Sequence, residues 1–426
     1  MMQQNDFEIH EELIESGDET EVSLLLYQTF AEQTAGMNND EAAQYLLGLL
    51  EGENLETEQL FARVATETRS QLPVTSYHPD RAVREASLAR KDTWRPGEGG
   101  ELSYTASNEL EVYLGTQGQP LEVSEALKEI RKLSESTVLT ARILLGLWNV
   151  RRYNKQVSRD GSVAVLLDEI LQWQGIQKHS RVAHVGTTKR YTDGYRVEQK
   201  QRVIQDLALL ASCHVRGTCT ITIQGKATPI EVDGPYLRYD TVSRRTSWDE
   251  KIILGFLVAP GGWISTYEQH QNESLAHIDR QIFTLNPQND RYALRLALYL
   301  TERWREQAKE GDFSTPIVMS DLLVASMIEA DKRHLTSEIA PRIEAALARL
   351  EEMEIIGKHL CLTPIDKEQA RWGKDWLASR WEILPPLELI RTYQALQRKK
   401  RTRKTRAKEG KESVPHQGSV QFQIPF

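Results

Sequence analysis

The sequence predicts an α+β, mainly helical fold in which helices are followed by antiparallel strands, and this order occurs twice. Apolar residues recur at helical spacing through much of residues 121–213, and the period then changes to two over 218–266. A shorter version of the same change occurs over residues 320–364. The length of 426 residues also exceeds one ordinary core. We therefore expect two or three domains.

Residues 1–72 are predicted to form an acidic helical segment. They carry 16 Asp and Glu residues against Arg63 and Arg69, whereas the rest of the chain has a net charge of +6. Apolar clusters at helical spacing occur in EVSLLLYQTFAEQ and DEAAQYLLGLLEG. Two interpretations stay open: a solvated helical appendage, or a dimerisation or regulatory segment that screens basic surface elsewhere.

Residues 73–120 are predicted to be a linker with little strand or helix of its own. Pro73, Pro79 and Pro96 interrupt this stretch, which also contains the glycine-rich sequences GEGG and GTQGQP. Proline and glycine at this density are typical of turns and loops.

The first folded unit is predicted to span residues 121–308. One or two helices are expected in 125–154, and another in 161–175, where Ser162 can cap and Gly175 can end the helix. A long helix follows at 195–213, and a closing amphipathic helix is expected at 285–308. The long helix has an inward apolar stripe, and the strands lie between these last two helices. The stripe is Val203, Ile204, Leu207, Leu210 and Ala211, and the strand segments are 218–224, 228–242 and 251–266.

The second unit is predicted to span residues 312–397 and to repeat the plan. Helices are expected in 320–331, capped by Ser320, and in 336–354. One or two strands are expected in 355–364, and a last helix follows Pro385 and Pro386. Three helices followed by antiparallel strands are the element order of a winged helix. We therefore predict two tandem winged-helix domains, the first with an elaborated antiparallel sheet, and a disordered basic tail over 398–426.

Signatures of enzymes and membrane proteins are missing from the sequence. No phosphate loop, dinucleotide-binding glycine pattern, nucleophile elbow or metalloprotease motif occurs. Cys213, His214 and Cys219 lie close together, but no second ligand pair follows at zinc spacing, so we expect buried small side chains. We predict no catalytic residue, cofactor or metal. Three cysteines and no apolar run of membrane-spanning length predict a cytoplasmic protein without a membrane partner.

A basic window at the start of the third helix is the main candidate for binding double-stranded DNA. Residues 178–202 hold seven Lys and Arg residues against Asp193 and Glu198. The start of a recognition helix contacts base edges, and nearby basic residues neutralise phosphates. A solvated helix face is the alternative. The predicted contacts are Lys178, Arg181, Lys189, Arg190, Tyr191, Tyr195, Arg196, Gln199, Lys200 and Arg202.

The second unit has a weaker signal for DNA binding. Lys332 and Arg333 precede its long helix, and Arg342 lies on that helix. Five Glu residues between 338 and 354 make the helix acidic, and like charge near phosphates is unfavourable. Docking on DNA by the first turn alone and a role in protein contacts both stay open.

The last residues of the sequence combine a basic run with an apolar peptide. Residues 398–411 carry nine Lys and Arg residues and one Glu, which predicts a disordered segment that binds polyanions or only solubilises the chain. In the final QFQIPF, Gln421, Ile424 and Phe426 match the pattern Gln-x-x-[Leu/Ile]-x-Phe. This pattern resembles the peptide by which bacterial replication proteins dock on the sliding clamp. A chance match or a strand-adding peptide is the alternative.

Taken together, the two predicted winged helices, the basic third helix and the basic tail resemble plasmid replication initiators of the tandem winged-helix type. The resemblance covers about residues 121–397 and is strongest over DEILQWQGIQKHSR and GYRVEQKQRVIQDLALL. It implies sequence-specific binding to repeated origin sites and recruitment of host replication proteins, including the clamp. The alternatives are a winged-helix transcriptional regulator that binds an operator as a homodimer and an adaptor that binds only proteins.

Overall fold

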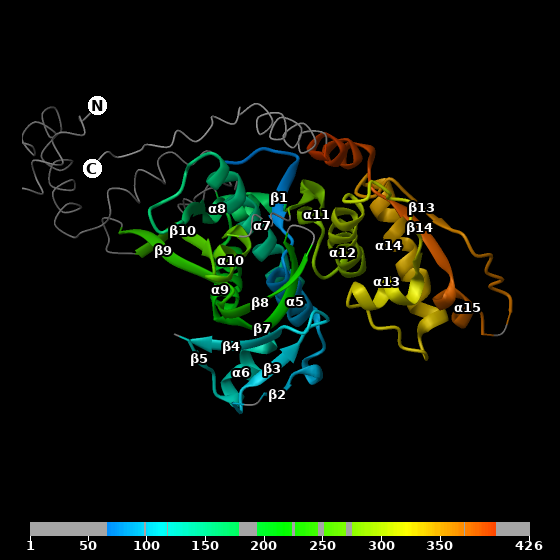
Figure 1. Cartoon of the computed structure of the whole chain (residues 1–426), viewed down its shortest axis with the longest axis horizontal. Helices are drawn as coiled ribbons and strands as arrows, with labels where there is room; N and C mark the ends of the chain where they lie inside the picture. The colour runs from blue at the N-terminus through cyan, green and yellow to red at the C-terminus, as the bar shows by residue number, and fades with distance from the viewer. Residues whose placement is uncertain are drawn as a thin grey trace, which may run out of the picture. The chain divides into compact units, whose positions relative to one another are not determined.

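The chain has a mixed α/β structure with several antiparallel sheets (Figure 1). The computed structural model describes residues 66–97, 99–116, 118–178, 194–223, 226–245, 251–269, 275–369 and 371–397. The chain divides into two compact units, Met1–Arg63 and Val64–Phe426. All described residues belong to the second of these units. Among them, no helix is both long and apolar enough to span a membrane.

The first half of the described chain contains a three-stranded sheet that is packed against three helices. The strands pair in the order β6-β10-β9, so the first strand along the chain pairs with the last. Phe256 of β10 lies opposite Val165 of β6 on one side and Thr241 of β9 on the other. The elements are α7 (Glu135–Tyr153), β6 (Val163–Leu166), α8 (Leu167–Trp173), α9 (Val197–Ser212), β9 (Leu237–Arg245) and β10 (Lys251–Pro260).

A long hairpin separates α9 from that sheet and extends the β structure. Strands β7 (Cys213–Ile223) and β8 (Lys226–Pro235) pair over ten residues each, and β7 also pairs with β4. Cys213 and Cys219 lie on β7 as buried free thiols. The other strands of this sheet come from the segment before α7. They are β2 (Arg95–Pro96), β3 (Leu102–Thr105), β4 (Glu111–Thr116) and β5 (Gln119–Pro120).

The structure therefore corrects the predicted linker at residues 73–120. Besides the four short strands, this segment contains α5 (His78–Leu88), and Pro79 lies in the first turn of that helix. Proline is tolerated there because the amide groups of the first turn have no helical partner. Leu110, Val112 and Leu114 are fully buried. Helix α6 (Val123–Ile130) then packs on β3 and β4.

The second half repeats the strand order of the first three-stranded sheet. Its strands pair in the order β12-β14-β13. A further helical segment, residues 387–397, follows β14. The elements are α12 (Arg291–Gln307), β12 (Ile317–Val318), α13 (Met319–Ala325), a π-helical turn (Leu335–Ile339), α14 (Ala340–Glu352), β13 (Lys358–Cys361), α15 (Trp372–Ala378) and β14 (Arg380–Leu384).

Smaller elements connect the two halves. Strand β1 (Gln71–Thr75) pairs with β11 (Leu275–Asp279), although some 200 residues separate them in the chain. Helices α10 (Trp263–Gln269) and α11 (Arg280–Thr284) flank β11 in sequence. Helix α12, which the sequence assigned to the first unit, packs against β11 and α7 and also against α13 and α14. It therefore belongs to both halves.

Two predicted helix caps are wrong for the same reason. Ser162 precedes strand β6, and α8 begins only at Leu167; Met319 opens α13, so Ser320 lies inside that helix. In both halves a short strand leads directly into the second helix. Short apolar runs such as VAVL do not distinguish strand from helix by spacing alone.

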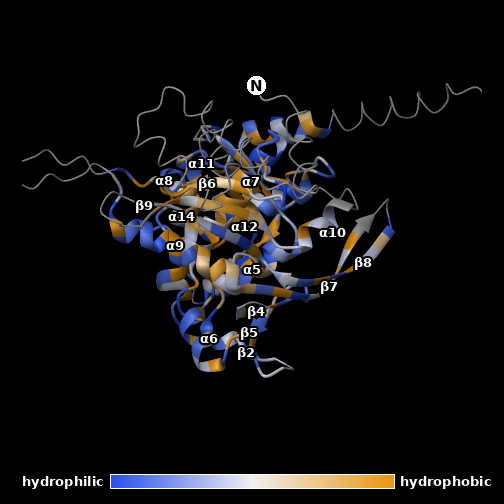
Figure 2. Ribbon diagram, turned by 90° about the vertical axis from the view of Figure 1, so that its left-hand side faces the viewer, coloured by the Kyte–Doolittle hydropathy of each residue, from blue (hydrophilic) through white to orange (hydrophobic). Residues whose placement is uncertain are grey.

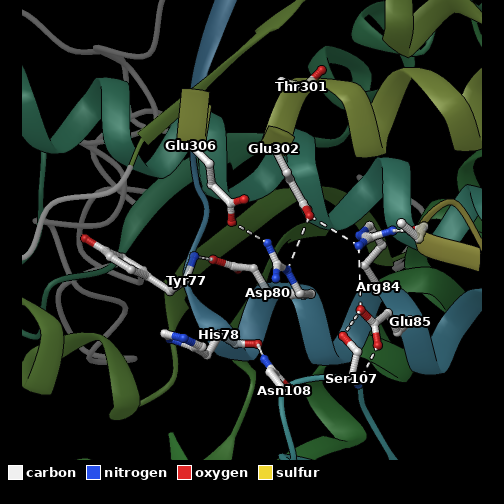
Figure 3. A network of polar contacts seen from close by, with 12 residues as sticks. Tyr77, His78, Asp80, Arg84, Glu85, Ser107, Asn108, Thr301, Glu302 and Glu306 are labelled. Carbon is white, nitrogen blue, oxygen red and sulfur yellow. Dashed lines mark hydrogen bonds and ion pairs between the residues drawn. The ribbon is translucent and has the colours of Figure 1, made fainter. Parts of the chain in front are cut away.

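The interior contains an apolar core and a buried ionic network. Hydrophobic residues gather along α7 and α12 (Figure 2). Between these helices and α5, the carboxylate of Glu302 contacts the guanidinium group of Arg84 at 3.2 Å (Figure 3). It also contacts the guanidinium group of Arg142 at 2.5 Å. All three side chains are buried. This network fixes α12 to α5 and α7.

Candidate nucleic-acid interface

The orientation of α9 is set by one buried carboxylate. Asp206, on the inner side of α9, accepts hydrogen bonds from Ser136 at 2.7 Å, Thr137 at 2.9 Å and Thr140 at 3.2 Å. These hydroxyl groups lie in the first turns of α7. Burial raises the pKa of Asp206, and the three hydrogen bonds oppose that shift. The Gln174 side chain, just after α8, donates to the Thr140 hydroxyl at 3.1 Å, so the cluster links all three helices.

A buried ion pair holds α8 against α7 and β6. Nη2 of Arg151 donates to both carboxylate oxygens of Glu169, at 2.8 Å and 2.7 Å. Its Nη1 donates to the backbone oxygen of Ala164 on β6. The side chain of Glu169 has no exposed surface and that of Arg151 has 4%. With two anchors on α7, helices α8 and α9 present a fixed surface.

The apolar side of α9 agrees with the predicted stripe. Val203, Leu207 and Leu210 are fully buried, and Ile204 is half-buried against the same core. Their spacing of three and four residues keeps them on one face of the helix. The opposite face, beginning at Arg196, lies in solvent.

Some of the predicted DNA contacts at the start of α9 are exposed, and others form ion pairs with Asp168 of α8. Arg196 and Arg202 are exposed, and Lys178 has 60% of its side chain in solvent. Lys200 is less free, because its ammonium lies 3.2 Å from Asp168 of α8. Asp168 also lies 3.6 Å from the ammonium of Lys178. One carboxylate therefore partly neutralises two of the predicted phosphate contacts.

Two other predicted contacts have structural roles. The side-chain oxygen of Gln199 accepts the backbone N–H of Arg196 at 2.9 Å and so caps α9. Tyr195 is half-buried, with the ammonium of Lys178 5.4 Å from its ring centre. Their part in DNA contact stays a prediction. Arg181, Lys189, Arg190 and Tyr191, as well as Gln421, Ile424 and Phe426, lie outside the described residues.

Around the start of α14, the second unit has both positive and negative side chains at its surface. Lys332 and Arg333 are exposed just before the helical turn that leads into α14. Arg342 is exposed but pairs with Glu338 one turn earlier, at 2.7 Å. Two of the helix's other carboxylates have partners within the fold: Glu344 accepts from Lys367 and Trp376, and Glu351 accepts from His359. The acidic character noted in the sequence is therefore reduced at the surface.

The structure also reveals an outward stripe on α9 that the sequence analysis did not single out. Val197 is 66% exposed, and Gln201 and Gln205 are exposed one and two turns further along. The signal was present in the sequence as uncharged residues at four-residue spacing opposite the apolar stripe. A criterion of positive charge does not find this stripe, because Val197, Gln201 and Gln205 are uncharged.

Basic residues also lie at the paired ends of β9 and β10. Arg245 lies opposite Lys251 in the strand register, and Arg244 precedes it at the end of β9. The basic dipeptide Arg244-Arg245 between two segments of period two could have indicated these basic strand ends from the sequence.

Comparison with known proteins gives distant structural neighbours, among them two crystal structures of RctB domains. No protein-family model and no curated protein matches the chain. A selenomethionine crystal structure of domains 2 and 3 of RctB is 10% identical, with a TM-score of 0.31, covering 64% of this chain and 85% of that one. Another crystal structure of RctB domains 2–3 is 8% identical, with a TM-score of 0.32, covering 70% and 97%. At these values the likeness assigns neither a fold nor a function to this chain.

Proposed function

We propose that this chain is a sequence-specific double-stranded DNA-binding protein with two winged-helix units, and that it acts as a plasmid-type replication initiator. The observation that carries the proposal is the exposed basic start of α9. Arg196 and Arg202 extend into solvent from a helix whose other face is anchored to α7 and α8. A helix held by its inner face, with basic residues at its outer N-terminal end, suits insertion into a major groove.

The order of elements supports the assignment of both units as winged helices. In the first, α7, β6, α8 and α9 precede the strands β9 and β10, and the sheet order is β6-β10-β9. In the second, α12, β12, α13 and α14 precede β13 and β14, and the sheet order is β12-β14-β13. Apart from α15, which lies between β13 and β14 in the second copy, the same helix-strand-helix-helix-strand-strand order with the same pairing occurs twice. The hairpin β7–β8 is an insertion in the first copy.

The replication role rests on the sequence. It draws on the resemblance to tandem winged-helix initiators, the basic run at 398–411 and the terminal QFQIPF. In this proposal, several copies bind repeated origin sites and strain a neighbouring A·T-rich stretch, while the tail recruits the clamp and other replication proteins.

A double charge reversal tests DNA binding. Arg196→Glu with Arg202→Glu should lower the affinity for duplex DNA at least tenfold, because phosphate contacts are replaced by repulsion. Lys128→Glu with Arg131→Glu, on the exposed side of α6, makes the same change in net charge and should leave most of the affinity intact. Binding to duplex fragments at several salt concentrations measures both effects. Equal losses in the two variants would remove α9 from the interface.

A deletion separates the initiator from the alternative regulator. Removing residues 421–426 should impair maintenance of a plasmid that depends on this protein while leaving duplex binding unchanged. A regulator needs no clamp-docking peptide. Intact plasmid maintenance together with repression of an operator would replace the replication role with a regulatory one.

A further inference from the structure

The uncharged outward stripe of α9, formed by Val197, Gln201 and Gln205, lies on the helix face opposite the core. Val197 is 66% exposed, and both glutamines are exposed. Within the part of the chain that the structure describes, neither glutamine carboxamide has a hydrogen-bond partner. By contrast, Gln199 on the same helix is engaged in capping. The stripe therefore offers two free carboxamides and one free branched apolar side chain.

Resting on the proposed function, we propose that this stripe reads A·T base pairs in the major groove. A carboxamide has one donor and one acceptor side, which match N7 and the N6 amino group of adenine in a bidentate contact. The methyl groups of Val197 offer an apolar contact for the 5-methyl group of thymine. The occupant of this helix face is thus duplex DNA with A·T pairs at the contacted steps.

The charges around the stripe fit this occupant. Arg196 precedes Val197 and Arg202 follows Gln201 in the chain, and both are exposed, so positive charge next to the stripe is available to phosphates. Glu198 is the acidic residue on this end of α9. Its carboxylate can accept from the amino group of cytosine, so we assign the A·T preference to the other three residues only.

The spacing of the stripe determines how many base pairs it can read. Residues four apart on an α-helix are separated by about 6 Å along the axis, so the stripe spans about 12 Å. Base pairs are about 3.4 Å apart, and the stripe therefore covers roughly three to four of them. Val197 and Gln201 lie at the N-terminal end, where recognition helices contact base edges. Gln205 reaches the far side of this short segment.

The first experiment selects sites from a pool of random duplexes with the full chain. The wild-type protein should enrich a site with consecutive A·T pairs. Gln201→Ala and Gln205→Ala should each relax the preference at a different base pair and lower the affinity for the selected site by roughly 5- to 150-fold, with binding to random duplex unchanged. Gln119→Ala, an exposed glutamine on β5, is the matched control and should select the wild-type site.

The second experiment replaces single atoms of the selected site. Exchanging adenine for 7-deazaadenine removes the N7 acceptor and should weaken the wild type by roughly fivefold, but not the glutamine variant that has lost that contact. Exchanging thymine for uracil removes one methyl group and should weaken the wild type by about fourfold, but not Val197→Ser.

The outcomes distinguish a failure of A·T readout by the stripe from a failure of the proposed DNA binding. Selection of an unchanged site by both glutamine variants, with unchanged affinity, overturns the inference and leaves DNA binding intact. Equal sensitivity of the wild type and the variants to the modified bases does the same. A wild-type chain that binds no duplex at low salt overturns the proposed function, and the inference fails with it.

Discussion

At the scale of single residues, Glu302 is a buried carboxylate that serves as counter-charge for buried arginines. Burial alone would raise its pKa, but the charges of Arg84, Arg142 and Arg81 lower the pKa below its ordinary value. The carboxylate thus stays ionised inside the protein because it has cationic partners. The two buried arginines in turn need a counter-charge, since a buried charge without a partner is strongly unfavourable; Arg84 also has Glu85 at 3.8 Å.

We expect Glu302→Gln to lower the free energy of unfolding by roughly 3–5 kcal/mol, because buried Arg142 loses its ion-pair partner and buried Arg84 loses one of two. Glu306→Gln is the matched control. Glu306 is 59% exposed and pairs with Arg81 at 2.8 Å, so its loss should cost about 1 kcal/mol or less. Urea unfolding of the full chain measures both. Similar losses in the two variants would contradict the role assigned to burial.

His277 on β11 predicts a pH dependence of stability. Burial, assisted by the charge of Arg305, lowers its pKa to about 4. Its ring lies edge-on to Tyr393 of the last helical segment, with the ring centres 5.8 Å apart. In the unfolded chain the pKa is higher, so between the two pKa values the unfolded state binds more protons. Stability is therefore lost as the pH falls from about 6.5 towards 4.

We expect the wild type to lose roughly 1–2 kcal/mol from this residue between pH 7 and pH 5. His277→Gln removes the titrating ring and should show a correspondingly smaller loss over the same range. The comparison uses the free energy of unfolding of both proteins at the two pH values. Equal losses of the free energy of unfolding in the two proteins would mean that His277 has the same pKa in the folded and unfolded states.

At the scale of elements, α9 combines a predictable inner face with a less predictable outer one. Val203, Leu207 and Leu210 lie in the core as their spacing predicts. The outer face depends on neighbours that are distant in sequence. Asp168 comes from α8, more than thirty residues before Lys200, and contacts the ammonium groups of that lysine and Lys178. Sequence reasoning treated these lysines as free, because it could not place the carboxylate beside them.

This arrangement predicts a gain in affinity. Asp168→Asn should raise the affinity for duplex DNA and steepen its salt dependence, by up to about 0.9 in the logarithmic slope for each freed lysine that contacts a phosphate. Stability should change by about 1 kcal/mol or less, because the Asp168 side chain is 44% exposed. Binding isotherms at several salt concentrations provide the measurement.

Glu129→Gln is the control for this gain, because it frees Lys132 at the end of α6 from a similar surface pair. Its binding should equal that of the wild type. A weaker complex in Asp168→Asn would indicate that Asp168 positions the lysines for DNA instead of competing with it.

The composition of other elements predicts the wrong structure. It predicts a helix start where strand β6 lies, and a linker over residues 73–120. In β6 the apolar run VAVL is compatible with either structure, and pairing with β10 decides in favour of the strand. In residues 73–120, Pro79 lies in the first turn of α5, Pro73 and Pro96 lie on the short strands β1 and β2, and several glycines lie in turns. Gly100 and Gly118, for example, have positive φ angles that other residues rarely adopt.

At the scale of the whole molecule, α12 connects the two copies of the repeated element order. It supplies Glu302 to the buried network and Arg295 to Glu135 at the start of α7, at 2.7 Å. It also packs against α14. We therefore expect the two units to act on DNA as one body with a fixed separation between α9 and α14.

A footprint tests this expectation. Lys332→Glu with Arg333→Glu should shorten the protected region at the end bound by the second unit and lower the salt slope by about 1.8, the value for two phosphate contacts. Protection at the end bound by α9 should remain. An unchanged footprint and slope would restrict DNA binding to the first unit and leave the second for protein contacts.

The sequence by itself determined that helices precede antiparallel strands in both halves, the inner face of α9 and the concentration of positive charge at its start. These follow from periodicity and composition, which are local properties. The tertiary structure decided the pairing of β1 with β11, the placement of α12 between the halves and the identity of the free side chains on α9. Those features depend on contacts between residues far apart in the chain, and the partner of Lys200 or Glu302 is set by packing and not by its neighbours in sequence.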